Sequence, residues 1–243
     1  MTIELSTLTF TNGADIVPAS GVDQILNTGI VNTLAGNDIL IGTSTSSDFN
    51  TVGINNYSGV INTGDGNDTL IGTSTGVFGY GIQNYNINDN SGIINTGAGK
   101  DTIIAIGPTY GIYNFKSIET GAGDDKITAT GGDFGIVNAG IINTGDGADS
   151  IIAYGGFYGT GSVFLGDGKD YLKGFGSGNF NGGNGKDTLE LTSGSYTVGI
   201  SGTAVNFTNG STIMNTSEFE KLQAGDITYN FASLTNGQTI FVA

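Results

Sequence analysis

The sequence predicts an all-β fold, a single-chain parallel β-solenoid of the β-helix or β-roll type, with a β cap at each end. Three observations support this. One ten-residue phrase recurs along most of the chain, Gly accounts for 44 of 243 residues, and short apolar runs are interrupted by Gly every few residues. Interior Gly costs a helix about 1 kcal/mol each, so these runs favour strands. Stacked coils of a solenoid join their apolar residues into one continuous core.

Composition narrows the chemistry that this chain can perform. It has no Cys and no His, so a disulfide framework, a thiolate zinc site and an imidazole base are all absent. The formal charge is −15, from 22 acidic residues and 7 basic ones, all of them Lys. We therefore expect no nucleic-acid partner and no anionic membrane partner. The N-terminus lacks a basic and apolar leader, so we expect no cleavable signal peptide, and no apolar run approaches the ~20 residues of a membrane span.

The recurring phrase defines the coils. The sixth residue of each copy is an Asp, which Leu or Ile follows two residues later, and the most regular copies are 24 residues apart. The copies are TLAGNDILIG from Thr33, TGDGNDTLIG from Thr63, TGAGKDTIIA from Thr96, TGAGDDKITA from Thr120, TGDGADSIIA from Thr144, LGDGKDYLKG from Leu165 and GGNGKDTLEL from Gly182. We predict coils of about 24 residues, with insertions such as residues 84–91 on one side of the rod.

A second phrase precedes the middle copies and supplies the other strands. It reads GINN from Gly53, GIQN from Gly81, GIYN from Gly111 and GIVN from Gly135, and an apolar pair follows each copy. Each coil thus offers roughly three short strands. We predict that Asn56, Asn84, Asn114 and Asn138 stack as a hydrogen-bonded ladder.

The ends of the chain change character, which gives three segments. Residues 1–31 are expected to form an N-terminal cap, with the stretch IELSTLTFTNG as a strand. Residues 32–191 form the repeats, and residues 192–243 form a C-terminal β cap that is also a possible uncleaved secretion signal. In this cap, Asn209-Gly210 predicts the turn of a β-hairpin.

The recurring phrase resembles the nonapeptide GGxGxDxUx of RTX, or haemolysin-type, calcium-binding repeats, in which U is a large aliphatic residue. Here the U position is filled in every copy, by Leu40, Leu70, Ile103, Ile127, Ile151, Leu172 and Leu189. Thr replaces the first Gly in five copies, and Leu34 replaces the second Gly in the first copy. The resemblance implies that glycine carbonyls point inward at Ca²⁺ and that the motif aspartates are ligands. The predicted metal ligands are Asp38, Asp68, Asp101, Asp125, Asp149, Asp170 and Asp187.

Seven motifs in order enclose at most six sites between coils. Six Ca²⁺ ions in one row would offset 12 of the 15 net negative charges. Without metal the stacked carboxylates repel one another, so we predict that folding is coupled to calcium binding. Cytosolic free calcium is far below the affinity of such turns, which favours a secreted, extracellular protein that folds after export. The tail is similar to those of RTX proteins that leave the cell by type I systems.

Three further rows of recurring residues suggest other functions. Thr33, Thr63, Thr96, Thr120 and Thr144 either form the flat ladder of an ice-binding solenoid or cap strand ends. Strict alternation would face Ile41, Ile71, Ile104 and Ile152 outward as an apolar stripe for self-association or a partner, whereas a bent corner would bury them. Val52, Tyr80, Tyr110, Phe134 and Tyr158 form a predicted aromatic row, for which packing is favoured over sugar stacking.

The predicted function is that of an exported calcium-binding solenoid with a structural or adhesive surface role. Ice binding is the first alternative, and a polysaccharide-active β-helix enzyme is the second. We expect no catalytic residues and no enzyme activity, since catalysis would have to rest on Asp, Glu, Lys or Tyr alone. Besides Ca²⁺, the candidate partners are a second copy of the chain and a cell-surface component or polysaccharide.

Overall fold

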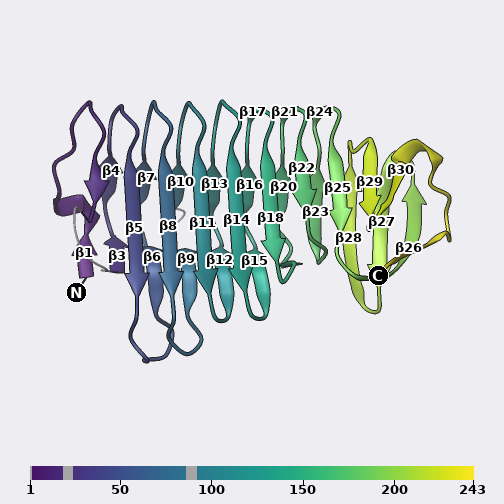
Figure 1. Cartoon of the computed structure of the whole chain (residues 1–243), viewed down its shortest axis with the longest axis horizontal. Coiled ribbons are helices and arrows are strands. Elements are labelled where there is room, and N and C mark those ends of the chain that lie inside the picture. The colour runs from purple at the N-terminus through teal and green to yellow at the C-terminus, as the bar shows by residue number, and fades with distance from the viewer. Residues whose placement is uncertain (1, 19–23, 86–91) are drawn as a thin grey trace.

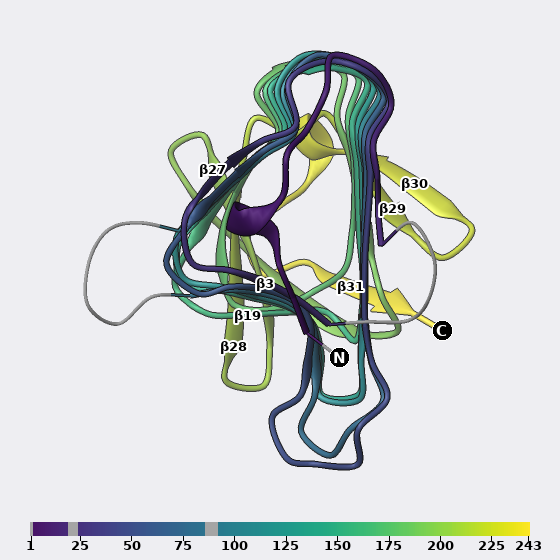
Figure 2. The same ribbon diagram turned by 90° about the vertical axis from the view of Figure 1, so that its left-hand side faces the viewer.

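Strands of successive coils pair in parallel and build three long sheets around a narrow core (Figure 1). The computed structural model describes residues 2–18, 24–85 and 92–243. Viewed along its long axis, the chain winds repeatedly around the same path, and the turns of successive coils superimpose (Figure 2). The prediction of an all-β parallel solenoid is confirmed. The predicted insertion at residues 84–91 falls mostly outside the described residues.

Sheet A carries the strands of the GI-x-N phrase. It runs in the order β1 (Thr2–Glu4), β3 (Gln24–Asn27), β6 (Val52–Asn56), β9 (Tyr80–Asn84), β12 (Tyr110–Asn114), β15 (Phe134–Asn138) and β19 (Phe157–Tyr158). All of these strands are parallel.

Sheet B follows the motif turns. It runs in the order β2 (Ile16–Val17), β5 (Ile39–Ser44), β8 (Thr69–Ser74), β11 (Thr102–Gly107), β14 (Lys126–Gly131), β18 (Ser150–Tyr154), β22 (Tyr171–Lys173), β25 (Thr188–Leu191), β29 (Lys221–Ala224) and β30 (Ile227–Asn230). Its last pair, β29 and β30, is antiparallel. Three isoleucines of the predicted apolar stripe, Ile41, Ile71 and Ile104, pair in register along this sheet, and Thr128 separates them from Ile152. All four are half-buried.

Sheet C precedes the motif turns. It contains β4 (Ile30–Asn32), β7 (Val60–Asn62), β10 (Ile93–Asn95), β13 (Ser117–Glu119), β16 (Ile141–Asn143), β20 (Ser162–Phe164), β23 (Gly178–Asn181), β28 (Thr212–Ser217), β27 (Ala204–Asn209), β26 (Gly194–Ser201) and β31 (Thr239–Val242). A small fourth sheet within the motif turns contains β17 (Asp146–Gly147), β21 (Asp167–Gly168) and β24 (Asn184–Gly185).

The core consists of three aliphatic ladders, one from each sheet. In-register pairing places equivalent side chains above one another, so that each coil extends every ladder by one residue. All seven residues predicted at the U position are buried; they form the sheet B ladder. Full burial of one such side chain contributes roughly 1.5–3 kcal/mol, and repetition along the rod makes this the main stabilising term.

Small residues let sheets A and B approach closely at the corner where they meet. A Cβ on Gly81, which opens β9, would lie 2.3 Å from the main-chain nitrogen of Ile106 in β11. A Cβ on Gly42 in β5 would lie 2.1 Å from the carbonyl oxygen of Gly53. The Gly of the GI-x-N phrase is therefore needed because any side chain there would collide with the backbone of the facing sheet.

The N-terminal segment differs from the prediction. Its strand β1 ends at Glu4, and the 3₁₀ turn η1 (Leu5–Thr7) follows, whereas residues 3–13 were predicted as one strand. The Thr7 hydroxyl donates to the carbonyl of Glu4 at 2.8 Å, and Leu5 is fully buried against the core. The turn thus closes the open end of the core with an apolar side chain.

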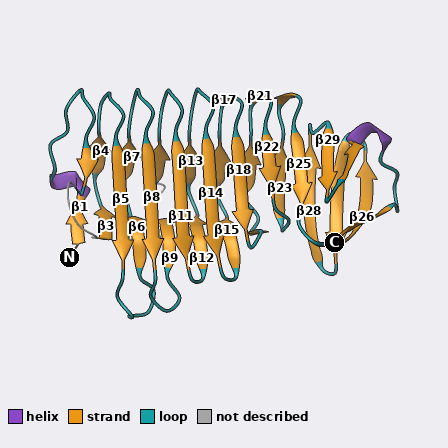
Figure 3. Ribbon diagram, viewed as in Figure 1, coloured by secondary structure: helices purple, strands orange, loops and turns teal. Residues whose placement is uncertain are grey.

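The solenoid also begins before residue 32, the predicted boundary. Strands β3 and β4 already belong to sheets A and C, so residues 24–32 extend the repeats. At the other end, β26, β27 and β28 form an antiparallel meander, and Asn209 pairs with Thr212 across the predicted turn. The 3₁₀ turn η2 (Phe231–Ser233) lies in this cap, and strands dominate elsewhere (Figure 3). Within the described residues, no helix has the length and apolar character needed to cross a membrane.

Candidate metal centre

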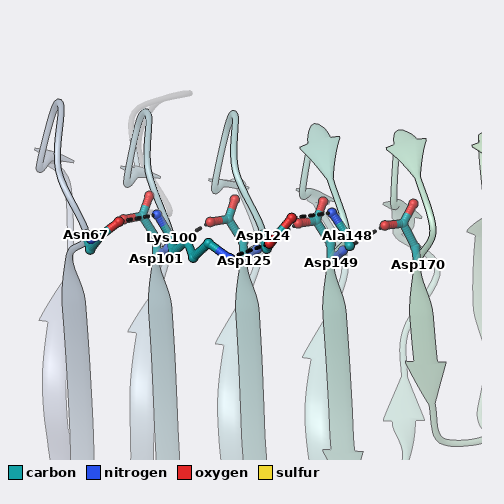
Figure 4. A network of polar contacts seen from close by, with 8 residues as sticks. All are labelled: Asn67, Lys100, Asp101, Asp124, Asp125, Ala148, Asp149 and Asp170. Atoms are coloured by element: carbon teal, nitrogen blue, oxygen red, sulfur yellow. Dashed lines mark hydrogen bonds and ion pairs between the residues drawn. The ribbon is translucent and has the colours of Figure 1, made fainter.

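The seven motif aspartates form one row along a single edge of the solenoid, which we call the aspartate row. Each lies at the end of the turn that leads from sheet C into sheet B, directly before a sheet B strand. Their side chains are 0–2% exposed, although they belong to a surface turn. Figure 4 shows four of them, Asp101, Asp125, Asp149 and Asp170, on successive coils.

One oxygen of each carboxylate is used to tie neighbouring coils together. The main-chain N–H of Asp101 donates to Oδ1 of Asp125 at 2.8 Å, and the same bond recurs along the row at 2.7–2.9 Å. Each aspartate thus accepts a bond from the preceding coil and donates one to the next.

Sequence reasoning missed both ends of this chain of bonds. The N–H of Asp15 donates to Oδ1 of Asp38 at 2.8 Å, and the N–H of Asp187 donates to Oε2 of Glu220 at 2.7 Å. Val17 and Leu222 follow Asp15 and Glu220 at the same two-residue spacing and pair in register with the core ladder of sheet B. This spacing between an acid and an aliphatic residue could have identified both acids. They were missed because neither acid follows a complete G-x-G turn.

The second oxygen of most row carboxylates has no hydrogen-bond partner. Within the described residues, the buried Oδ2 atoms of six aspartates are left unpaired, those of Asp68, Asp101, Asp125, Asp149, Asp170 and Asp187. In the first motif, the Thr33 hydroxyl bonds to Oδ2 of Asp38. A buried carboxylate oxygen without a donor costs several kcal/mol unless a proton or a cation neutralises it.

Burial also raises the pKa of these carboxyl groups. Loss of hydration raises the pKa of Asp101, Asp149 and Asp187 to about 6 and that of Asp170 to about 7, and the bond from the preceding N–H offsets part of this effect. The pKa values of Asp68 and Asp125 are raised for the same reason. Neighbouring carboxylates add to the rise at Asp101, because they repel a second negative charge.

The predicted threonine row is buried. Thr33, Thr63, Thr96, Thr120 and Thr144 are all 0% exposed. The Thr63 hydroxyl donates to the carbonyl of Thr96 at 3.0 Å, and the other members make the equivalent bond. The single hydroxyl hydrogen can be donated either to this carbonyl or to the carboxylate of the same coil, as from Thr33 to Oδ2 of Asp38. A hydrogen bond from Thr63 offsets part of the rise in the pKa of Asp68. A row that faces the interior cannot present a flat threonine ladder to ice, and this part of the prediction is wrong.

The motif glycines point their carbonyls along the rod. The carbonyl of Gly64 accepts from the N–H of Ala98 at 3.0 Å, and that of Gly97 accepts from Ala122 at 3.0 Å. A Cβ on Gly99 would lie 1.7 Å from the carbonyl oxygen of Gly66. The expectation that these carbonyls point inward is therefore wrong, because stacking of the coils uses them to pair neighbouring turns. Leu34 adopts a φ of +79° at a position where the other copies have Gly, so the turn requires a left-handed backbone conformation there.

The remaining acids of the motif lie outside the turn. Asp65, Asp146 and Asp167 are exposed. Asp124 pairs with Lys100, which lowers the pKa of that carboxyl, and it accepts from the N–H of Ala148 at 3.1 Å (Figure 4). These groups are solvated and stabilise the outside of the turn; they are separate from the buried Oδ2 atoms.

The carboxylate oxygens of the aspartate row are chemically suited to bind a hard cation. Anionic carboxylate oxygens with no competing donor are the ligands that Ca²⁺ prefers. In the part of the chain that the structure describes, no three acidic, His or Cys side chains converge as a ready-made metal cluster. Ca²⁺ requires six to eight oxygens, so hydroxyl, main-chain or water oxygens would have to complete each site.

The corner between sheets A and C holds a second buried row, the asparagine row. Its members are Asn27, Asn56, Asn84, Asn114 and Asn138. Each Nδ2 donates to Oδ1 of the next member at 2.8–2.9 Å. The predicted asparagine ladder is confirmed, and Asn27 extends it by one member.

No model of a known protein family matches the sequence, and no curated protein matches it.

Proposed function

We propose that this chain is an RTX-type calcium-binding β-solenoid with a structural or adhesive role outside the cell, and that it is not an enzyme. The observation that carries the proposal is the single file of six buried Oδ2 atoms without donors. Ca²⁺ bound along this file would neutralise the carboxylates and bridge successive coils. The residues that would hold it are Asp68, Asp101, Asp125, Asp149, Asp170 and Asp187, with Asp38 at the N-terminal end.

The charge of the chain supports a role for a cation. The net charge is −15, and the row aspartates are stacked at the coil spacing of ~4.8 Å. Charges at this separation repel strongly in a buried site. A divalent cation removes this repulsion, whereas protonation does so only at acid pH. Calcium therefore acts as a condition for stability at neutral pH.

Calcium-dependent folding would also couple folding to export. Extracellular calcium modules have dissociation constants of roughly 0.1–1 mM, far above cytosolic free calcium. The chain would stay expanded inside the cell and fold outside, which suits export through a type I system.

Far-ultraviolet circular dichroism tests this proposal. In excess chelator at neutral pH, we expect an expanded or molten chain. Addition of calcium to about 1 mM should produce the β spectrum cooperatively, and the same concentration of magnesium should not. The exposed variant Asp133→Asn is the matched control and should fold with the same midpoint. A complete β spectrum in excess chelator, with a melting temperature that calcium leaves unchanged, would contradict the proposal.

A further inference from the structure

Aromatic side chains form a strip along the outer face of sheet A. Its rings are stacked from coil to coil, with centroids 5.4 Å apart for Tyr80 and Tyr110, 6.3 Å for Tyr110 and Phe134, and 4.9 Å for Phe134 and Tyr158. Tyr113 adds a second column and lies 5.7 Å from Tyr110 at an interplanar angle of 7°. The predicted aromatic row is confirmed for its four aromatic members, whereas Val52 is buried. We call these five rings the aromatic strip.

The strip remains accessible. Tyr158 is 56% exposed, and the other four rings are half-buried. Along the rod the strip spans three coil steps, roughly 15 Å at ~4.8 Å per step.

At its C-terminal end the strip meets a groove of about 450 Å³. Phe134 and Tyr158 line it on the solenoid side, Phe175 lines it as well, and Thr192, Asn209 and Thr212 contribute polar groups from the cap. The groove exists because the coils shorten. Sheet A ends at β19, where the N–H of Phe157 bonds to the carbonyl of Phe175 at 2.9 Å, while the β27–β28 hairpin continues beside sheet C.

The groove is uncharged. Among its lining residues in the described chain, there is no Asp, Glu or Lys. Its polar groups are hydroxyls and an amide, which both donate and accept hydrogen bonds. The net charge of −15 opposes an anionic ligand, and no cation lines the groove to attract one. This argues against nucleic acid and acidic sugars as the occupant.

We infer that the aromatic strip and this groove bind a neutral, linear polysaccharide. A pyranose ring presents C–H groups on its faces, and these pack on the negative faces of aromatic rings. Its equatorial hydroxyls match the donors and acceptors of Thr192, Asn209 and Thr212. One sugar sits against Tyr158 in the groove, and the following sugars lie along the strip toward Tyr80. This inference goes beyond the calcium site and rests on the proposed function only in that the chain must be folded, because sheet A and the aspartate row lie on different parts of the rod.

Titration with neutral hexasaccharides tests the inference. The probes are cellohexaose, chitohexaose and mannohexaose, with hyaluronan hexasaccharide as the anionic comparison. The chain has 10 Tyr and no Trp, so tyrosine emission reports on the strip, and calorimetry measures affinity. All titrations are made in about 5 mM calcium, with circular dichroism recorded on each sample, so that a failure to fold is distinguished from a failure to bind.

We expect at least one neutral hexasaccharide to bind and the anionic one not to bind. Tyr158→Ala should weaken binding about tenfold, because it removes the most exposed ring of the strip and with it the apolar surface that the sugar would cover. Asn209→Ala, on the opposite wall, should also weaken it, whereas Phe49→Ala should not change it. Phe49 is the matched control because it is exposed and stacks on Phe78 at 5.8 Å in a loop remote from the groove.

Three results would overturn the inference. One is that none of the neutral probes binds the folded protein. Another is that hyaluronan hexasaccharide binds as tightly as the neutral probes. The third is that Tyr158→Ala and Asn209→Ala, both folded, bind as the wild type does.

Discussion

Two corners of this solenoid hold buried polar rows, and they are satisfied in different ways. In the asparagine row, each amide before the last donates to the next amide oxygen, and its Nδ2 also donates to a main-chain carbonyl, as in the 3.0 Å bond from Asn114 to Ile141. Asn138, the last member, donates to the carbonyl of Ser162. In the aspartate row, Oδ1 of each carboxylate accepts a hydrogen bond from a main-chain N–H. A carboxylate has no hydrogen to donate, so neighbouring carboxylates cannot form hydrogen bonds to one another's Oδ2 atoms.

The difference lies in one chemical group. An amide both donates and accepts, so a column of amides closes its own hydrogen bonds at the coil repeat. A carboxylate only accepts, so a column of carboxylates needs donors or cations from elsewhere. The asparagine corner is therefore self-sufficient, and the stability of the aspartate corner depends on the solution. In this chain, the stability of the asparagine corner is therefore expected to be independent of calcium and pH, and the stability of the aspartate corner is expected to depend on both.

The largest expected effect comes from breaking the self-sufficient corner. Asn114→Leu removes an amide that bonds to Asn84, Asn138 and Ile141 and leaves buried groups unpaired. We expect a loss of about 3 kcal/mol in the free energy of unfolding, equal with and without calcium wherever the chain folds. Urea denaturation measures it. Gln83→Leu, which faces outward, is the control and should change stability by less than about 0.5 kcal/mol.

A second substitution makes the aspartate corner resemble the asparagine corner. Asp125→Asn keeps the oxygen that accepts from the N–H of Asp101, removes the charge and adds a donor. We expect the metal-free chain to become more stable by about 1 kcal/mol and the calcium-loaded chain to become less stable. In chelator at neutral pH, circular dichroism should show more β structure for Asp125→Asn than for the wild type, and in calcium its melting temperature should be lower. Asp133→Asn should change neither. A change in the same direction in both conditions would contradict the comparison.

The position of an aspartate in its row should set its effect on cooperativity. Asp125 has row aspartates on both sides, whereas Asp187 has Asp170 on one side and Glu220 on the other. Asp125→Ala should therefore lower the Hill coefficient of calcium binding more than Asp187→Ala does. Calorimetric titration gives both values, and the opposite order would argue against ions that bridge successive coils.

The smallest effect is the pH dependence of the metal-free chain. Its raised pKa values, about 6 to 7 for Asp101, Asp149, Asp170 and Asp187, exceed the usual Asp value of about 3.9. The folded state then binds more protons than the unfolded state between about pH 4 and pH 7, so stability falls as pH rises through this window. In chelator, circular dichroism should show a gain of β structure as the pH is lowered from 7.5 to about 5. A loss of β structure over this range would show that the carboxylates are stabilised as anions without metal.

The features that could be predicted from the sequence are those that recur in every coil. The row aspartates, the core residues Leu40 to Leu189 and the asparagine ladder were visible because in-register stacking requires the same residue type in every coil. Asp15 and Glu220 were missed because they take the row position outside the G-x-G context. The interior position of the threonines was missed because it depends on how the backbone turns, which residue identity alone does not give.

The groove beside Tyr158 could not be predicted from local patterns. It results from the shortening of the last coils, which ends sheet A at β19 while sheets B and C continue into the cap. Such a step depends on which strands pair over long distances. The aromatic row was visible in the sequence, but its access to solvent depends on that pairing.

Anomalous diffraction from crystals of the wild-type protein grown in excess calcium tests the central claim most directly. The account predicts peaks in single file along the aspartate edge, beside the Oδ2 atoms of Asp68 through Asp187, and none along the asparagine edge. A map that shows the same fold with no peaks along the aspartate edge would contradict it.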